Sequence, residues 1–282
     1  MSRIALFLFS FCSLFSLQTA SADRAPRGYD LLHSHPQYAF RYSAPGEPVR
    51  RGAKSERFEV RDGYCKADDC AADRLRSEIM IPTRKAKSRV GRSIWFGWSF
   101  HISQLSSELR KNGTSPQFGQ WKTAAPNSPT ITFIAAGGKG RGDVYVRLGD
   151  MAAKNNNVVA GAKWGFVCKR HFSVSQAMKG WVDVVMTTNF SSRSDGYIKI
   201  WVNGAQTCDY RGQIVATQSA RDYAGPNHRR GIFIGSTKTW RERAGNKPIP
   251  TIVVFYDEFL VGNKRIDVDT RMREAAGLPA KD

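Results

Sequence analysis

The clearest alternation of apolar and polar positions lies between Gly180 and Gly204, in the stretch GWVDVVMTTNFSSRSDGYIKIWVNG. Two alternating segments flank a connection rich in Ser, Asn, Asp and Gly, which is typical of a long antiparallel β-hairpin. On the second segment Tyr197, Lys199 and Trp201 share one face, because successive side chains alternate across a strand. Rings beside a cation suit a sugar that carries a carboxylate, although these rings could equally fill a second interface between sheets.

The same alternation predicts further short strands on both sides of the hairpin, at residues 38–42, 57–61, 76–81, 94–101, 130–135, 143–148, 165–172, 231–235 and 252–261. Turn signals rich in Gly, Asn and Asp separate these strands. Short helical segments are predicted at residues 103–110, 175–179 and 269–276. Many short strands with little helix predict an all-β fold, a jelly-roll β-sandwich.

The N-terminal segment, residues 1–22, has the pattern of a secretory signal peptide. Arg3 supplies a positive charge, an apolar run follows, and Ala20, Ser21 and Ala22 form a small-residue cleavage signal after which we expect cleavage. The apolar run is too short for a membrane span. We therefore expect an exported protein, secreted or periplasmic, with a poorly ordered segment at residues 23–36, one domain at residues 37–268 and a charged C-terminal tail at residues 269–282.

Four cysteines remain after the predicted leader is removed: Cys65, Cys70, Cys168 and Cys208. An even number in an oxidising compartment predicts two disulfides with three possible connectivities. The pattern favours a local Cys65–Cys70 loop and a Cys168–Cys208 bridge between strands. Zinc is the competing interpretation, but no histidine lies at ligand spacing from a cysteine pair, so we expect no metal ion and no cofactor.

Charge limits the kind of partner. The whole chain carries a formal charge of +19, and the mature chain carries +18, from 42 basic minus 24 acidic residues once Arg3 is removed. A strongly basic protein favours an anionic partner. Nucleic acid fits poorly with export and with the lack of a nucleic-acid motif, whereas an acidic polysaccharide fits both charge and compartment. The alternative is a merely solubilising surface. We expect a monomer.

Two polar strand patterns could carry chemistry. In Arg74-Leu75-Arg76-Ser77-Glu78-Ile79, Arg76 and Glu78 share a face, so the carboxylate can orient the guanidinium for a bidentate contact with a substrate carboxylate. The alternative is a solvated row of charges of little energetic value. In Phe118–Lys122, Gln120 and Lys122 share a face, and an amine whose pKa is lowered by nearby cations could act as a base.

A third pattern is the basic segment Asn227–Phe233, which leads into a predicted strand. Arg229 and Arg230 follow His228, and adjacent arginines favour its neutral form, which can accept a proton. A surface histidine without a chemical role is the alternative interpretation.

Four segments carry a resemblance to a known family: YAFRYSAPGEPVRRGAKSERFEVRDGYCKADDCAADRLRSE at 38–78, GQW at 119–121, DGYIKIWVNG at 195–204 and VVFYDEFLVG at 253–262. The chain resembles the bacterial polysaccharide lyase family related to heparin lyase I and glucuronan lyase. The resemblance implies a concanavalin-A-like jelly roll with a concave substrate groove, in which acidic polysaccharides are cleaved by β-elimination. Residues 37–268 are thus predicted to be a lyase-like domain.

Site residues follow from the resemblance one by one. It implies that Arg76 binds the substrate carboxylate, that Glu78 orients it, and that Gln120 is the glutamine of a Gln-Trp-His or Gln-Ile-His motif. The chain departs from that motif at Lys122, which replaces the histidine. The family's Tyr-Phe-Lys-x-Gly-x-Tyr strand corresponds to Asn227–Phe233, where both tyrosines are replaced.

Within that strand Arg229 stands for the family's lysine. The general acid and base stay open among Lys122, His228, Tyr197 and Tyr223.

The predicted function is cleavage of a uronic-acid polysaccharide by an exported lyase. Arg76 and Gln120 would neutralise the carboxylate beside the reacting carbon, so that its proton becomes acidic. The candidates for holding flanking sugars are Arg147, Lys199, Trp201 and Arg229. One alternative is a protein that binds the polymer without cleaving it. A glycoside hydrolase ranks third, because the chain lacks the Glu-x-Asp-x-x-Glu strand found in jelly-roll glucanases.

Overall fold

The computed structural model describes residues 23–32, 36–66, 68–122, 129–135, 142–149, 166–215, 225–235 and 237–282. The predicted leader and the candidate Tyr223 lie outside these residues. Within them, no helix is long and apolar enough to cross a membrane.

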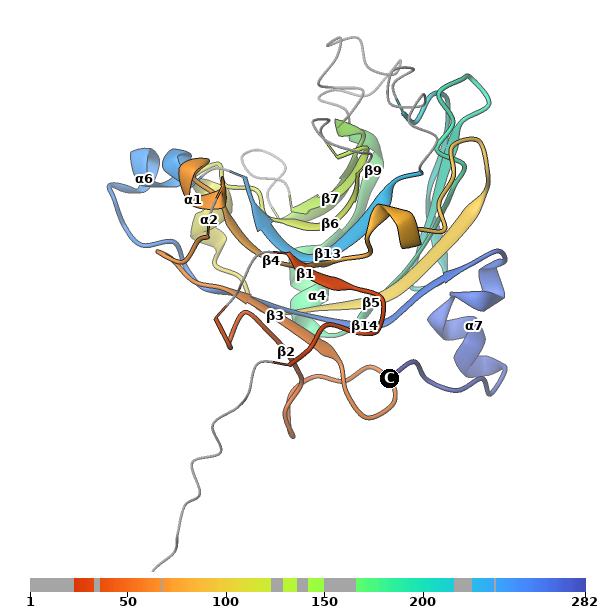
Figure 1. The fold of residues 1–282 in the computed structure, drawn as a ribbon, viewed down its shortest axis with the longest axis horizontal. Helices are drawn as coiled ribbons and strands as arrows, with labels where there is room; N and C mark the ends of the chain where they lie inside the picture. The colour runs from red at the N-terminus through yellow and green to blue at the C-terminus, as the bar shows by residue number, and fades with distance from the viewer. Residues whose placement is uncertain are drawn as a thin grey trace, which may run out of the picture.

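Two antiparallel sheets form a jelly-roll sandwich, as predicted (Figure 1). Sheet A has the order β1 (Asp30–Leu32), β4 (Leu75–Met80), β13 (Asn227–Ile234), β6 (Gln117–Lys122), β7 (Ile131–Ala135), β8 (Asp143–Arg147) and β9 (Phe166–Ser173). Sheet B has the order β12 (Ala205–Arg211), β11 (Tyr197–Val202), β10 (Val182–Thr188), β5 (Ile94–Gln104), β14 (Ile252–Gly262), β3 (Glu56–Val60) and β2 (Phe40–Tyr42). Figure 1 shows sheet A curved inside sheet B, with its outer face concave.

Short helices connect the strands: α1 (Asp68–Ala71), α2 (Ser107–Lys111), α4 (Val174–Lys179), α6 (Lys238–Ala244) and α7 (Thr270–Ala275), with 3-10 turns η1 (Thr83–Lys85) and η4 (Arg265–Asp267). The helical segments predicted near α2, α4 and α7 are present. Strand β1 lies inside the stretch predicted to lack order, where it pairs with β4. Helices α1 and α6 were not predicted.

The predicted hairpin of residues 180–204 is present as β10 and β11, paired from Val184 and Val202 to Thr188 and Ile198. Ile198 and Ile200 are fully buried in the core between the sheets. Their alternation with partly exposed neighbours is what fixes the register, since a one-residue slip would expose the apolar face.

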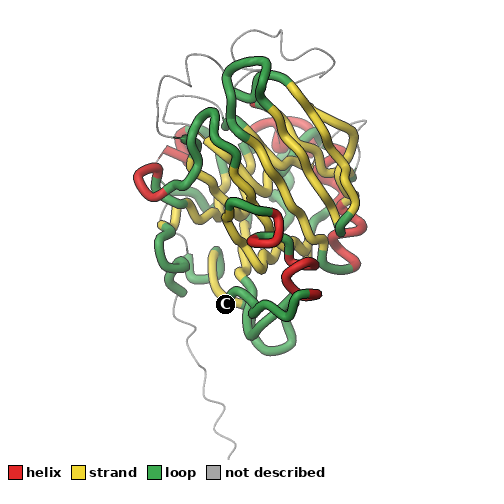
Figure 2. The backbone as a smooth tube through the Cα atoms, turned by 90° about the vertical axis from the view of Figure 1, so that its right-hand side faces the viewer, coloured by secondary structure: helices red, strands yellow, loops and turns green. Residues whose placement is uncertain are grey.

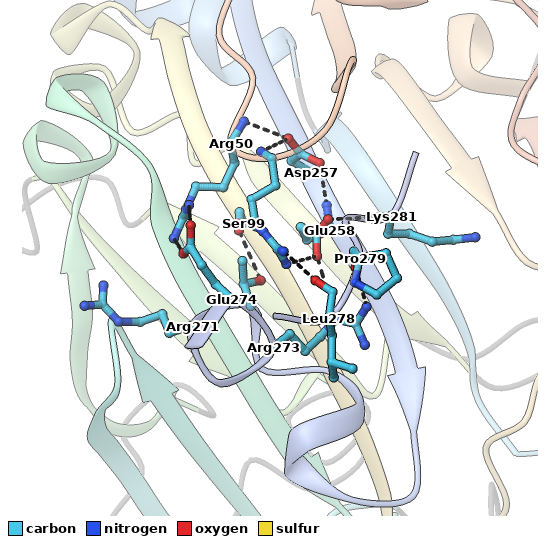
Figure 3. A network of polar contacts seen from close by, with 12 residues as sticks. Arg50, Ser99, Asp257, Glu258, Arg271, Arg273, Glu274, Leu278, Pro279 and Lys281 are labelled. Atoms are coloured by element: carbon cyan, nitrogen blue, oxygen red, sulfur yellow. Dashed lines mark hydrogen bonds and ion pairs between the residues drawn. The ribbon is translucent and has the colours of Figure 1, made fainter. Parts of the chain in front are cut away.

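The C-terminal residues pack on one end of the outer face of sheet B (Figure 3). Arg50 forms ion pairs with Asp183 at 3.2 Å and with Glu274 at 2.8 Å. Asp257 accepts hydrogen bonds from the backbone N–H groups of Arg50 and Arg51 at 2.7 and 3.1 Å. Burial raises the pKa of Asp257 to about 6. The segment predicted as a charged tail therefore contributes helix α7 and a network of polar contacts to the fold.

Both favoured disulfides are confirmed. Cys65–Cys70 closes a local loop beside α1, with Cα atoms 5.0 Å apart. Cys168 on β9 is bonded to Cys208 on β12, with Cα atoms 5.4 Å apart. Since β9 is an edge strand of sheet A and β12 is an edge strand of sheet B, this bridge joins the two sheets along one side of the sandwich.

Removal of the bridge between the sheets should lower the free energy of unfolding substantially. A Cys168→Ser and Cys208→Ser double variant frees a loop with a sequence separation of 40 residues, which should cost about 3–4 kcal/mol in the chain-entropy model. The matched Cys65→Ser and Cys70→Ser variant frees a separation of 5 residues and should cost about 2 kcal/mol. Denaturant unfolding of both variants measures the difference, and an equal or reversed order would contradict it.

Candidate active site

Polar side chains on neighbouring strands of sheet A form one row across its concave face. The pairing places Arg229 of β13 beside Gln120 of β6, Gln120 beside Thr132 of β7, and Thr132 beside Arg147 of β8. Residues directly opposite in antiparallel strands share a face, and adjacent strands lie about 4.8 Å apart. The row therefore presents an amide and a hydroxyl between two guanidinium groups.

Arg76 on β4 is held in place by two carboxylates. Its Nη2 donates to Oδ1 of Asp69 at 3.0 Å, and its Nη1 lies 3.4 Å from Oε2 of Glu78. The guanidinium carbon lies 4.7 Å from the centroid of the Phe233 ring, in a cation–π contact. The side chain of Arg76 is 9% exposed, and its buried Nε has no hydrogen-bond partner among the described residues. A guanidinium fixed on two sides retains donors for an anionic ligand.

Gln120 and Glu78 meet across an intervening strand. Nε2 of Gln120 donates to Oε1 of Glu78 at 2.6 Å, although β13 lies between β6 and β4. Gly231 stands directly opposite Glu78 on β13, with φ at +129°. A side chain there would approach the backbone oxygen of Ser77 within 2.1 Å. Glycine at this position therefore allows β13 to pass close to the backbone of β4 at Ser77 and Glu78.

Glu78 is the central carboxylate of the cluster and is buried. Burial raises its pKa, while the neighbouring Arg76 and Arg229 and the hydrogen bond from Gln120 oppose the rise. Glu78 thus contacts both Arg76 and Gln120, the two residues that the sequence analysis assigns to the substrate carboxylate. Their expected proximity is confirmed by this geometry.

Lys122 lies on the same face, opposite Asn227 in the pairing of β6 with β13. Burial lowers the pKa of Lys122, and the positive charges of Arg229, Arg76 and Arg74 lower it further. Within the described part of the chain, no carboxylate forms an ion pair with its amine. A lowered pKa increases the fraction of neutral amine, which is the form that can accept a proton.

Two arginines on the concave face also have no acidic partner within ion-pair distance among the described residues: Arg229 and Arg147. Burial lowers the pKa of both guanidinium groups. The Nε–H groups of both are buried and donate no hydrogen bond to another described residue. Buried cations without a counterion are costly, so this face is electrostatically prepared for an anion.

His228 does not belong to this site, and its prediction as a catalytic group facing the substrate is corrected. Strand alternation turns His228 inward, away from its neighbour Arg229, and leaves it 2% exposed. Its Nε2 lies 2.7 Å from the hydroxyl of Tyr29, and its ring stacks on Phe259 at 4.8 Å. Its pKa is well below the usual value, because of burial and the charge of Arg230, but the ring is enclosed in the core.

The aromatic face of the central hairpin is also not part of the site. Tyr197, Lys199 and Trp201 belong to β11 of sheet B, and their partly exposed side chains alternate with the core residues of that strand. They lie on the outer, convex face of the sandwich, whereas Arg76 lies on the concave face of sheet A. The alternative that these rings fill an interface between sheets is likewise wrong. The predicted roles of Tyr197 as a catalytic group, and of Lys199 and Trp201 as contacts for flanking sugars in the same groove, are therefore wrong.

Asp69 is a site residue that the sequence analysis did not identify. It is 2% exposed and lies on α1, one residue before Cys70 of the local disulfide. Its only sequence signal was its place inside the CKADDC segment, seven residues from Arg76. The short disulfide loop therefore fixes the carboxylate that orients Arg76.

Loss of the Asp69 charge should loosen Arg76 without removing it. We expect Asp69→Asn to lower kcat/KM on the substrate about tenfold, mainly through KM, because one charge-assisted hydrogen bond is weakened. Asp68→Asn is the matched control, since Asp68 is an exposed neighbour. Steady-state kinetics of the two variants tests this role, and equal activity in both would contradict it.

The cluster can bind a carboxylate, polarise it and take up a proton nearby. Among the described residues, no group of three or more His, Cys, Asp or Glu side chains is placed to hold a metal ion.

Comparison with known proteins identifies the family. Residues 28–260 match the family model described as polysaccharide lyase. No curated protein sequence matches the chain. Among solved structures, an endo-beta-1,4-glucuronan lyase from the fungus Trichoderma reesei is similar, with a TM-score of 0.61 and 18% identity over 88% of this chain and 96% of that chain.

Two alginate lyases are also similar in structure. A family 7 enzyme, A1-II', has a TM-score of 0.51 and 12% identity over 81% of this chain and 84% of its own. Alginate lyase Aly36B has a TM-score of 0.50 and 15% identity over 82% and 85%. At these identities the likenesses show a shared fold. Because the family model covers well over half of the 282 residues, the chain belongs to the polysaccharide lyase family.

Proposed function

We propose that the protein cleaves a uronic-acid polysaccharide by β-elimination at the concave face of sheet A. The observation that carries the proposal is the linked set of Arg76, Glu78 and Gln120, with Lys122 on the same face. This set places groups for a carboxylate beside an amine with a lowered pKa. β-Elimination needs both features.

In the proposed reaction, Arg76 and Gln120 bind the carboxylate of the uronate whose C5–H bond breaks. Their donors stabilise the negative charge that develops on that carboxylate as the proton leaves. The neutral amine of Lys122 accepts the proton from C5. The C5–H electrons form the C4–C5 double bond as the C4–O bond breaks. The ammonium of Lys122 then donates its proton to the leaving glycosidic oxygen, which balances the step without a second titratable group.

The neighbouring uronates of the polymer are assigned to the unpaired cations of the row. Arg229 and Arg147 are three strands apart, which corresponds to about 14 Å. Carboxylates on successive sugars can pair with these guanidinium groups and offset the cost of their burial. The support for this class of substrate is the charge of the face, together with structural neighbours named for glucuronan and alginate.

A protein that binds the polymer without cleaving it is the second candidate. It is favoured by Phe233, whose ring has no hydroxyl to donate or accept a proton, at a position where the resembling family has tyrosine. The set of Arg76, Glu78 and Gln120 would then act only in binding.

The experiment is a scan of acidic polysaccharides, including polyglucuronate and alginate, by the ultraviolet absorbance of the unsaturated uronate product. A rise in absorbance on one of these polymers, and none on a neutral glucan, supports β-elimination. Retention on an immobilised polymer without any product would establish the binding protein instead. If the protein neither cleaves nor retains any of these polymers, both candidates are contradicted.

We further propose that the protein is an exported monomer. Two disulfides support an oxidising compartment, because such bonds are rare in reducing cytosol. Analysis of the secreted and periplasmic fractions, with the N-terminus of the mature chain determined, tests cleavage after Ala22.

A further inference from the structure

The outer face of sheet B, together with the adjoining segment that precedes β5, carries an aromatic and basic surface that the proposed reaction does not use. Its aromatic part is Trp95, Tyr197 and Trp201, and its basic part is Lys87, Arg89, Arg92 and Lys199. We refer to these seven residues as the convex patch. Figure 2 looks onto the side of the molecule that includes the outer strands of sheet B and helix α7. We propose that the convex patch is a second binding site for a carboxylated polysaccharide chain, which rests on the proposed function for the class of ligand.

The two indoles form a stacked pair across a strand. The ring centroids of Trp95 on β5 and Trp201 on β11 are 5.5 Å apart, with an angle of 23° between their planes. The intervening strand β10 places Thr187 next to Trp95 in the pairing, and Thr187 is only 3% exposed. The guanidinium of Arg265 lies over Trp201 at 4.7 Å. Trp95 is partly exposed, and among the described residues its ring has no aromatic or cation–π contact besides the one with Trp201.

Such a pair is a platform for sugars, because the apolar faces of pyranose rings pack on flat aromatic surfaces. Fixed stacking between the indoles also lowers the conformational entropy that a ligand would have to remove. An outward tryptophan pair on a convex sheet face is not required by the core, which is formed by the alternate residues Phe96 and Trp98.

A basic hollow adjoins this platform. Its volume is about 320 Å³, and Lys87, Arg89 and Arg92 line it without any acidic residue. Ser93 also lines the hollow and accepts a hydrogen bond from the hydroxyl of Tyr197 at 2.7 Å. Gly262, a further lining residue, is the pairing partner of Trp95. The hollow and the aromatic platform therefore share one continuous surface.

The charge of the surface selects the ligand. The three cations of the hollow are exposed and, within the described residues, form no ion pair, whereas Lys199 lies 3.4 Å from Asp209. Aromatic rings alone would suit a neutral glucan, and cations alone would suit any polyanion. Their combination favours a chain whose sugars carry carboxylates, with one ring stacked on the platform and a neighbouring carboxylate in the hollow.

The aromatic part of the patch and the candidate active site lie on opposite faces of the sandwich. One polymer molecule that contacts both raises the local concentration of cleavable chain at sheet A, because the second contact becomes intramolecular. The effect should be confined to long chains. Short oligosaccharides cannot reach from one face to the other.

The test measures binding in a background that disables the concave face. Arg76→Ala with Lys122→Met serves as the parent, and affinity electrophoresis in gels with alginate, polyglucuronate or a neutral glucan gives apparent dissociation constants. Adding Lys87→Ala and Arg92→Ala should raise the constant for the acidic polymers about three- to tenfold, since each exposed charge contributes modestly. The charge-matched control is Lys179→Ala with Lys247→Ala, two exposed lysines elsewhere.

A separate pair of variants, Trp95→Ala and Trp201→Ala, tests the platform, with far-ultraviolet circular dichroism as the check on folding. If a tryptophan variant unfolds, the variant with Lys87→Ala and Arg92→Ala still decides the test, because Lys87 and Arg92 are exposed and their removal should not affect folding. Equal affinity of the patch and control variants for the acidic polymers would overturn the proposal. So would sedimentation showing that the patch joins two copies of the chain. If the unmodified protein cleaves none of the polymers, while the patch substitutions still weaken binding, only the proposed function is contradicted.

Discussion

Arg76→Ala should lower kcat/KM on the acidic polymer by about 10²–10³-fold, the loss typical of removing one donor that stabilises a developing charge. The structural basis is the position of its guanidinium, which is held by Asp69 at 3.0 Å and by Glu78 at 3.4 Å. Arg76→Lys should be nearly as damaging, because an ammonium cannot reproduce the planar two-donor contact. Glu78→Gln should cost less, about tenfold, since it weakens the orientation of the guanidinium without removing it.

The control for Arg76 separates chemistry from stability. Its removal takes a positive charge away from two buried carboxylates, Asp69 and Glu78, so a lower free energy of unfolding is expected as well. Kinetics should therefore be measured far below the unfolding transition of each variant. Similar activity of the alanine variant and the unmodified protein under those conditions would exclude Arg76 from the site.

Lys122→Met should reduce kcat by about 10²–10⁴-fold, the usual contribution of a general base, and should remove the alkaline rise of the activity. In the unmodified protein activity should rise with pH, because the neutral amine is the active form. The rise should be centred below the ordinary lysine pKa of about 10.4, since burial and the charges of Arg229, Arg76 and Arg74 lower the pKa. The negative charge of a bound uronate raises the pKa of Lys122 again. The rise of kcat with pH should therefore lie at higher pH than the rise of kcat/KM.

Lys122→His is the informative companion variant. An imidazole has an ordinary pKa of about 6.5, and the same surroundings should lower it, so the rising limb should move toward acid by several pH units. The pH profiles of kcat and kcat/KM for the three proteins provide the measurement. An unchanged alkaline limb in Lys122→Met would assign the base to another residue.

The departures of this chain from its family are consistent with a relocated proton transfer. By the resemblance of the two motifs, Lys122 corresponds to the family's histidine, and Phe233, which packs against Arg76, corresponds to a tyrosine. The aromatic ring is kept while its hydroxyl is lost. A single amine surrounded by arginines then takes the role of both acid and base in the proposed reaction.

Much of this architecture could be predicted from the sequence, for a local physical reason. Alternation of apolar residues over short segments determines strands, and a run such as Tyr197–Val202 has one face that must be buried. The grouping of Arg76 with Glu78, and of Gln120 with Lys122, follows from the same two-residue period. Even the two disulfide pairs followed from count, compartment and position.

Only the tertiary structure decided which faces meet. Tyr197 and Trp201 show the same alternation whether their strand lies in sheet A or sheet B, so periodicity could not assign them to the convex side. His228 and Arg229 are neighbours in sequence, yet their opposite directions place one in the core and the other at the site. The contact of Asp69 with Arg76 depends on a loop closed by Cys65–Cys70, and the Gln120–Glu78 bond joins two strands that a third strand separates. Local sequence patterns thus specify the strands and the chemistry of each strand face. Strand order and sheet curvature specify which of those faces form the site, because the contacts within the site join residues that no local pattern relates.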